Sequence, residues 1–238
     1  MDVTGVWKDC FDPAKKEAPG KGTVVAVIDT GVDYTHKDLA DNIWVNEGEI
    51  PGNGIDDDGN GYVDDVHGVD FVEGDSDPMD EHGHGTHVAG IIAMTPGNGG
   101  GVGVAYGAKI MCVRAGQANG SFASTDIAKA IKYAADNGAD VINMSFGGTG
   151  RSYLVESALQ DAFPSCVLVA AAGNDGLPTT DAKQAGYLFT EDIYPAGYKY
   201  VIGVMATDNN KSLAYFSNWD FKEGSGCEYE MAAPGVGI

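Results

Sequence analysis

The chain has 238 residues, of which 43% are hydrophobic and 21% are charged, a composition typical of one soluble globular domain with a large core. Acidic residues outnumber lysine and arginine by 35 to 14, and the net charge of −21 argues against nucleic-acid binding, because phosphates require a basic surface. No apolar run is long enough to cross a bilayer, so we expect no membrane span. The four cysteines show no zinc-ligand spacing, and we expect free buried thiols at Cys112 and Cys166.

Short apolar runs recur along the chain and are rich in valine, isoleucine and alanine with little alternation, which indicates strands buried on both faces of a parallel sheet. These predicted strands are residues 23–28, 109–115, 141–145, 166–172 and 200–206. Residues 125–137 show helical periodicity, with Ser124 or Thr125 as the expected cap and Gly138 just beyond the end. Strands alternating with helices predict an α/β fold, whose active sites lie at the carboxyl ends of the strands.

Asp29 is the first polar group at a predicted strand end. It follows the buried run 24–28 and precedes a turn at Thr30 and Gly31. An acid at this place can orient a neighbouring imidazole. Taken alone, Asp29 is more simply a turn residue that binds its own backbone.

Three histidines lie together in His82-Gly83-His84-Gly85-Thr86-His87, just before the apolar residues 88–92. A histidine at the start of this predicted helix faces the strand ends, where it can act as a general base. A zinc site is the competing interpretation, but His84 and His87 are only three residues apart and no H-E-x-x-H motif is present.

Asn174 follows the small-residue run 169–172 and Gly173. A side-chain amide at a strand end can donate a hydrogen bond to a developing oxyanion. Taken alone, Asn174 is also simply a turn residue.

Together and in this order, the three segments resemble the catalytic blocks of the subtilisin-like serine endopeptidases, the subtilase family. The resemblance runs from residue 22 to residue 238. It implies a three-layer α/β fold with a central, mostly parallel sheet flanked by helices, in one peptidase domain over residues 1–238. It also implies that Asp29 and His84 are catalytic, that Asn174 binds the oxyanion, and that the protein is extracellular or at the cell surface, although no signal peptide is visible.

The resemblance further implies where a peptide or protein substrate binds. Residues 140–148 resemble the wall of the family's primary specificity pocket, and residues 114–116 and 120–122 resemble the edge on which substrate pairs as an added strand. The implied substrate-binding residues are Gly116, Gly120, Ser121, Ser145, Phe146, Gly147, Ala172 and Gly173.

Two acidic loops are candidate calcium sites, because calcium prefers oxygen ligands from flexible loops. The first resembles a thermitase-like calcium loop and implies the side chains of Asp70, Glu73 and Asp75 and the carbonyls of Asp77 and Met79. The second follows the first half of an EF-hand loop and comprises Asp56, Asp58, Asn60, Tyr62 and Asp64. His67 stands where an EF-hand has its closing glutamate, and both segments can also be read as solvated acidic loops.

The family's nucleophile lies in a Gly-Thr-Ser motif that follows a segment like residues 231–238, and no such motif is present here. Ser145 belongs to the implied pocket wall and Ser217 to a turn, so neither is expected to serve. We therefore expect an endopeptidase whose serine is carried by a second polypeptide. The alternatives are a catalytically inactive, calcium-stabilised binding module and a dinucleotide-binding enzyme, but no G-x-G-x-x-G follows the first strand.

Overall fold

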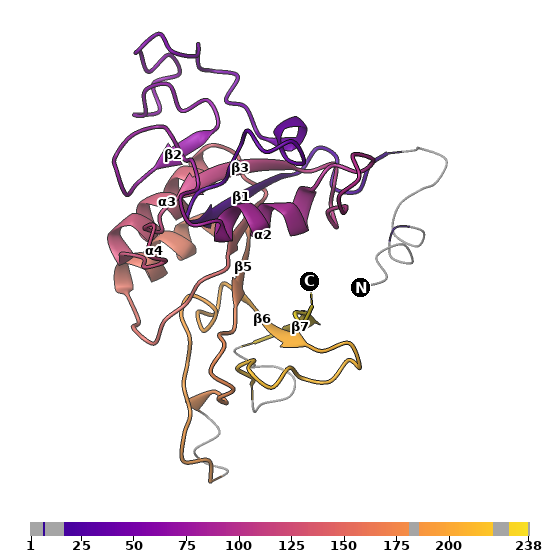
Figure 1. Ribbon diagram of the computed structural model, residues 1–238. Helices are drawn as coiled ribbons and strands as arrows, with labels where there is room; N and C mark the ends of the chain where they lie inside the picture. The colour runs from indigo at the N-terminus through magenta and orange to yellow at the C-terminus, as the bar shows by residue number, and fades with distance from the viewer. Residues whose placement is uncertain (1–6, 8–16, 181–185, 221–228, 238) are drawn as a thin grey trace. The chain divides into compact units, whose positions relative to one another are not determined.

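The computed structural model describes residues 7, 17–180, 186–220 and 229–237. The chain divides into two compact units, residues 2–142 (the first unit) and residues 143–238 (the second unit), and Figure 1 follows both by colour. Within the described ranges, no helix has both the length and the apolar character that a bilayer span requires.

The first unit is built on three parallel strands, β1 (Val24–Asp29), β2 (Gly68–Asp70) and β3 (Lys109–Arg114), with β3 between the other two. Successive residues of β1 and β3 are buried, as expected for strands that are covered on both faces. The strand registers place Arg114 opposite Asp29 on one side and opposite Asp70 on the other. Three charged side chains therefore stand at neighbouring strand ends.

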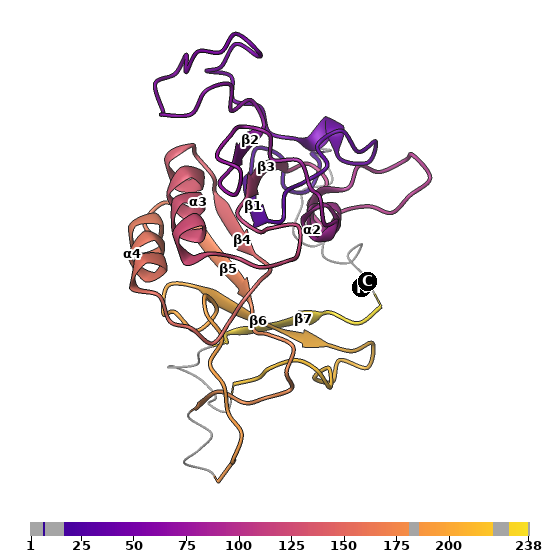
Figure 2. The ribbon, with the colours of Figure 1, turned by 60° about the vertical axis from the view of Figure 1, so that its left-hand side comes forward.

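Two helices, α2 (His84–Ala93) and α3 (Ser124–Asp136), contact β1 and β3, and they lie on opposite sides of these strands in Figure 2. The core beneath α2 contains small and β-branched side chains, namely Val25, Val27, Ala89, Ala93, Ile110 and Cys112. Cys112 and Cys166 are free buried thiols, as predicted, whereas Cys10 and Cys227 lie outside the described residues.

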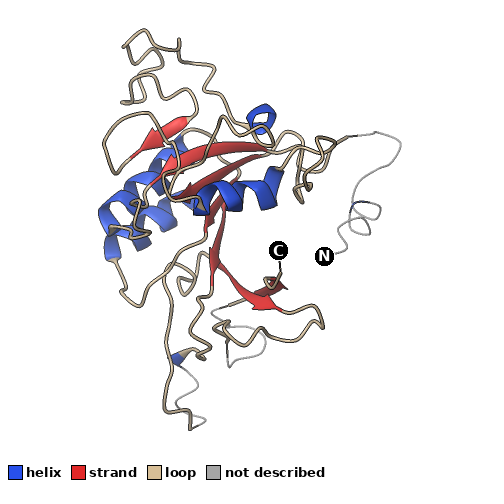
Figure 3. Ribbon diagram, in the orientation of Figure 1, coloured by secondary structure: helices blue, strands red, loops and turns tan. Residues whose placement is uncertain are grey.

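A long loop connects the short 3-10 helix η1 (Ala40–Asn42) to β2. Residues 44–67 contain no helix or strand and are drawn entirely as loop in Figure 3. The second predicted calcium loop lies within this segment, so hydrogen bonds of side chains and turns must hold it in shape.

The second unit contains α4 (Tyr153–Ala162) and three strands, β5 (Val167–Ala171), β6 (Ile202–Thr207) and β7 (Met231–Pro234). β6 pairs in parallel with both β5 and β7. The remaining strand, β4 (Val141–Met144), spans the point at which the chain divides.

The five predicted strands correspond to β1, β3, β4, β5 and β6, and the predicted helix corresponds to α3. The prediction that Ser124 or Thr125 caps α3 is wrong, because the N-cap residue is Ala123 and it makes no side-chain hydrogen bond. Gly138, with φ of 81°, follows the helix as predicted. β2 and β7 were not predicted: β2 has only three residues, and β7, with the sequence Met-Ala-Ala-Pro, lacks the valine and isoleucine that marked the other strands.

Candidate active site

Asp29 ends β1 and is fully buried. Its Oδ1 accepts hydrogen bonds from the backbone N–H of Thr30 and from Nδ1 of His84, each at 2.7 Å. Its Oδ2 is buried and has no hydrogen-bond partner among the described residues. The buried carboxylate therefore bonds to one nitrogen, Nδ1, of a single imidazole.

His84 is the first residue of α2, and its side chain is 45% exposed. The helix start can approach β1 this closely because residue 85 is glycine: a Cβ there would lie 2.1 Å from the carbonyl oxygen of Gly31. The hydrogen bond to Asp29 raises the pKa of His84 against the opposing effect of burial, and the negative charges of Asp29 and Asp80 add to the increase. With Nδ1 bound to Asp29, Nε2 is the atom that can take up a proton.

Asp80, which sequence reasoning missed, holds the loop that leads to His84. Its Oδ1 accepts hydrogen bonds from the hydroxyl of Thr30 and from the N–H groups of His82 and Gly83, each at 2.9 Å. Its Oδ2 accepts from the N–H of Thr86 at 2.9 Å and from its hydroxyl at 2.6 Å. Burial alone would raise the pKa of Asp80, but these hydrogen bonds outweigh it, and the pKa is lowered. No sequence pattern pointed to Asp80, because its contacts depend on the turn.

Asp70, from the first predicted calcium loop, ends β2 and is almost fully buried. Its Oδ1 accepts from the N–H groups of Val72 at 2.6 Å and Glu73 at 3.2 Å. Its Oδ2 lies 3.0 Å from Nη1 of Arg114, but the two groups are not aligned as a hydrogen bond. Burial raises the pKa of Asp70, although the two amides and Arg114 oppose it. A buried carboxylate oxygen without a hydrogen bond fits a site for a cation.

The rest of this loop is closed by backbone hydrogen bonds between residues 70 and 75, at 2.9 and 3.1 Å. Asp75 Oδ1 accepts from the N–H of Asp77 at 3.0 Å, and Asp77 Oδ1 accepts from the hydroxyl of Tyr34 at 2.9 Å. The Met79 carbonyl faces Gly31, where a Cβ would lie 2.7 Å from its oxygen. The five ligand roles stay predictions.

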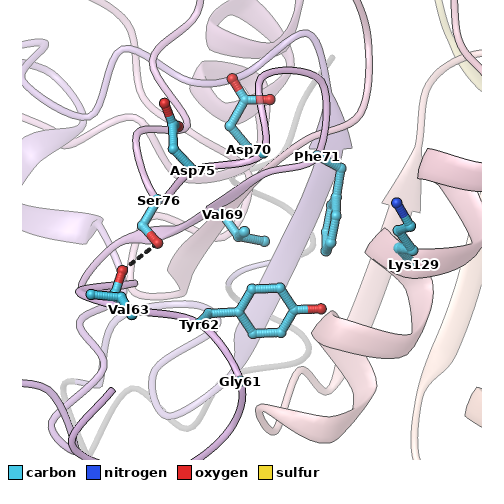
Figure 4. Close-up of a pocket in the computed structure, with 10 residues that line it drawn as sticks. Gly61, Tyr62, Val63, Val69, Asp70, Phe71, Asp75, Ser76 and Lys129 are labelled. Atoms are coloured by element: carbon cyan, nitrogen blue, oxygen red, sulfur yellow. Dashed lines mark hydrogen bonds between the residues drawn. The ribbon is translucent and has the colours of Figure 1, made fainter. Parts of the chain in front are cut away.

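A pocket of about 660 Å³ lies beside this loop, between residues 61–63, residues 69–76 and Lys129 of α3 (Figure 4). Its walls include the rings of Tyr62 and Phe71, whose centroids are 5.8 Å apart. In Figure 4, the carboxylates of Asp70 and Asp75 extend to one side of the loop, away from the Tyr62 ring. A cation held by these carboxylates would therefore not lie against the aromatic wall.

The second predicted calcium loop binds backbone amides at both ends. Asp56 accepts from the N–H groups of residues 59, 60 and 61 at 2.8–3.1 Å. Asp64 accepts from those of residues 52, 53 and 54 at 2.8–3.2 Å. Between them, Asp58 accepts from the side-chain amide of Asn60 at 3.2 Å, and the N–H of Tyr62 donates to Asn60 Oδ1 at 2.8 Å. Asp56 and Asp64 thus each shape a different turn, and their roles as ligands stay predictions.

Glu49, Asp58 and Asp65 offer carboxylate oxygens within 4.8 Å of one another, and sequence reasoning missed Glu49 and Asp65. Asp65 is fully buried and accepts from the hydroxyl of Tyr133 at 2.6 Å, and burial raises its pKa. Glu49 accepts from the N–H groups of residues 57, 58 and 64 at 2.8–3.2 Å. Unlike Asp70 Oδ2, the oxygens of this cluster already have hydrogen-bond donors.

In the first unit, the implied substrate edge begins beside Asp29. The N–H of Gly116 donates to the carbonyl of Asp29 at 2.9 Å, and Gly116 forms an antiparallel bridge with Phe122. The N–H of Gln117 donates to the carbonyl of Ser121 at 2.9 Å, and Gly120, with φ of 79°, completes the turn between them.

In the second unit, Asn174 is exposed and follows β5, as expected for a residue at a strand end. Asn218, which sequence reasoning missed, holds this turn: its N–H donates to the carbonyl of Gly173 at 3.0 Å, and its Oδ1 accepts from the N–H of Asp175 at 2.9 Å. The N–H of Ala172 donates to Val204 of β6 at 3.0 Å. The oxyanion role of Asn174 stays a prediction.

Three implied pocket residues, Ser145, Phe146 and Gly147, also lie in the second unit. Ser145 accepts a hydrogen bond from the side chain of Asn143 at 2.9 Å, and Phe146 is half-buried. A Cβ at Gly147 would lie 2.4 Å from the Ile193 side chain, so any larger residue would require that side chain to shift.

The family model described as the subtilase family matches residues 20–237. This chain belongs to the subtilase family. The subtilase chain is 42% identical over 219 residues to the thermophilic serine proteinase of Bacillus sp. (strain AK1), covering 91% of this chain and 45% of that protein. It is 36% identical over 237 residues to thermitase of Thermoactinomyces vulgaris, covering 96% of this chain and 71% of that protein.

A solved structure, that of a cold adapted subtilisin-like serine proteinase, matches this subtilase with a TM-score of 0.68 and 30% identity. The match covers 92% of this chain and 65% of that chain, and it confirms the predicted subtilisin-like α/β fold. This subtilase chain therefore spans about two thirds of the matched structure and less than half of the Bacillus relative.

The chemistry available in the described part of the first unit is that of a base and its orienting acid. Asp29 fixes the imidazole of His84, and the exposed side of the ring is left for a nucleophile. No serine among the described residues of the first unit hydrogen-bonds to His84: Ser76 donates to the carbonyl of Val63, and Ser121 to Asn119.

Proposed function

We propose that the protein is a serine endopeptidase in which this chain supplies the catalytic aspartate, Asp29, and the general base, His84. One observation carries the proposal: in a member of the subtilase family, the buried carboxylate of Asp29 lies 2.7 Å from Nδ1 of a half-exposed histidine. This geometry keeps Nε2 able to accept a proton and stabilises the imidazolium that then forms.

In this proposal, His84 takes the proton of a serine hydroxyl that lies outside residues 1–238, on a second polypeptide or elsewhere in a longer chain. The side-chain amide of Asn174 donates to the oxyanion. A peptide substrate pairs as an added strand with the edge that contains Gly116, Gly120 and Ser121, and residues 145–147 and 172–173 line its primary pocket. The similarity to a thermophilic serine proteinase and to thermitase, together with the family match, supports a peptidase.

Calcium is part of the same proposal, with a stabilising role. Asp70 and Asp75 would hold the ion, together with the Glu73 side chain and the carbonyls of Asp77 and Met79. The unsatisfied Oδ2 of Asp70 supports this site over the loop at residues 56–64, whose acids are already bound to amides. Bound calcium would add positive charge beside Asp70 and keep the loop closed. Family membership also supports an extracellular location, which detection of the protein in the medium of its source cells would test.

Labelling with a fluorophosphonate tests the function, because this reagent reacts with an activated serine. The complete protein should be labelled, and His84→Ala should prevent labelling while leaving the protein folded. Mass spectrometry of the labelled peptide would show which polypeptide carries the serine. A folded protein that takes no label would favour the alternative, a binding module without catalytic activity.

A further inference from the structure

The carboxylate of Asp80 accepts five hydrogen bonds from three separate parts of the first unit. The donors are the Thr30 hydroxyl just after β1, the N–H groups of His82 and Gly83 before α2, and the N–H and hydroxyl of Thr86 in its first turn. All five distances lie between 2.6 and 2.9 Å. One carboxylate therefore ties a strand end to a helix start.

Thr30 connects Asp80 with the catalytic pair. Its N–H donates to Oδ1 of Asp29, the same oxygen that binds His84, at 2.7 Å. Its hydroxyl donates to Asp80 and accepts from the N–H of Gly85 at 3.1 Å. A displacement of Asp80 would thus reach both partners of the bond between Asp29 and His84.

The start of α2 also has no ordinary side-chain cap. Its N-cap residue is Gly83, with φ of 98°, which offers no side-chain acceptor. Asp80 fills this role, because it accepts from the N–H groups of Gly83 and Thr86 and places a negative charge at the helix N-terminus. Residue 85 packs closely against the carbonyl oxygen of Gly31. A small shift of the N-terminus of α2 would therefore move His84 relative to Asp29.

We propose that Asp80 is a positioning residue for His84: through Thr30 and the first turn of α2, it holds the imidazole in line with Asp29. The inference rests on the proposed endopeptidase function and adds a second acid to its site. Asp80 acts through His84 and does not bind substrate. The charged and titratable groups that face the imidazole are Asp29 from β1, Asp80 from the preceding loop, and the ring of His82, whose centroid is 6.3 Å away.

The test compares Asp80→Asn with Glu81→Gln in the complete protein. Both remove one negative charge from adjacent residues, but Glu81 is directed to Arg114, at 2.7 Å. We expect Asp80→Asn to lower kcat by about tenfold to a hundredfold with KM changed less than about threefold, because misplacement of a catalytic group affects the chemical step. Glu81→Gln should leave kcat close to that of the wild type. The His84 pKa, followed by NMR, should fall in Asp80→Asn and change less in Glu81→Gln.

If Asp80→Asn does not fold, Thr30→Val and Thr30→Ser replace it: valine should lower kcat, and serine, which restores the hydroxyl, should recover most of it. A folded Asp80→Asn with wild-type kcat and wild-type His84 pKa would overturn the proposal, as would equal losses in Glu81→Gln or a Thr30→Val variant with wild-type kcat. A wild-type protein without peptidase activity would instead contradict the proposed function, and the comparison of His84 pKa values would still decide the role of Asp80.

Discussion

Arg114 joins Asp70 and Glu81 at the ends of the strands of the first unit. Its Nη1 lies 3.0 Å from Oδ2 of Asp70, and its Nη2 lies 2.7 Å from Glu81, three residues before His84. The side chains of Arg114 and Asp70 are almost completely buried, whereas Glu81 is exposed. One buried guanidinium thus connects the predicted calcium loop with the loop that leads to His84.

In the calcium-free protein, replacing Arg114 by leucine would leave the carboxylate of Asp70 buried without a counter-charge. We expect the free energy of unfolding to fall by about 3–5 kcal/mol, as is typical when one partner of a buried ion pair is removed. Urea denaturation would measure the loss. The control is Arg151→Leu, because Arg151 is exposed and its pair with Glu156 should contribute far less. Similar losses in both variants would contradict the importance of the buried pair.

Replacing Asp29 by asparagine should lower kcat by about 10⁴-fold, since the amide keeps the geometry but no longer favours the tautomer with a proton on Nδ1. Steady-state hydrolysis of a peptide substrate would measure it. Asp33→Asn is the matched control, because Asp33 follows the same strand, but its carboxylate binds Thr35 and not the imidazole. A decrease in kcat of less than tenfold in Asp29→Asn would contradict a catalytic role for the hydrogen bond between Asp29 and His84.

The activity should rise with pH through a pKa above the ordinary histidine value. His84 can accept a proton only when it is neutral, and its hydrogen bond to Asp29 raises its pKa. A plot of kcat/KM against pH should therefore lose activity on the acidic side at a higher pH than for an unperturbed imidazole. In Asp29→Asn, this acidic limb should move to lower pH. An acidic limb that Asp29→Asn leaves in place would assign the titration to another group.

Chelation of calcium should lower the melting temperature of the complete protein. An ion present at a hundred times its Kd stabilises the folded state by about 2.7 kcal/mol, and each kcal/mol corresponds to roughly 2–4 °C for a chain of this size. Asp75→Asn should weaken the response to chelator, whereas Asp41→Asn, an exposed acid outside the loop, should preserve it. An unchanged melting temperature after chelation would contradict the proposal that bound calcium stabilises the protein.

Five of the strands, the helix α3 and the places of Asp29 and His84 at the ends of elements could be predicted because each depends on a local pattern. Buried apolar runs mark the strands, and a polar residue directly after such a run must lie at a strand end, as Asp29 does. His84 precedes an apolar helical run, which places it at the start of α2. The family blocks then bring the two residues together.

The contacts of the other acids could not be predicted, because they depend on how turns place backbone amides. The alternation from Asp56 to Asp64 suggested one ion site, yet these two carboxylates bind amides of different turns. The contacts of Asp80 and Arg114 were missed for the same reason, since each connects segments that are distant along the chain. The error at the start of α3 was smaller: Ser124 and Thr125 are both good caps, but the helix begins after Ala123.

The most direct measurement of the central claim is kcat/KM of the complete protein for a peptide substrate in two histidine variants. His84 and His87 are both exposed and lie three residues apart in α2, but only His84 bonds to Asp29. We predict that His84→Ala lowers kcat/KM by at least about 10⁴-fold, as expected when the base of such a triad is removed. His87→Ala should keep kcat/KM within about threefold of the wild-type value. Comparable activity in the two variants would contradict the assignment of His84 as the general base.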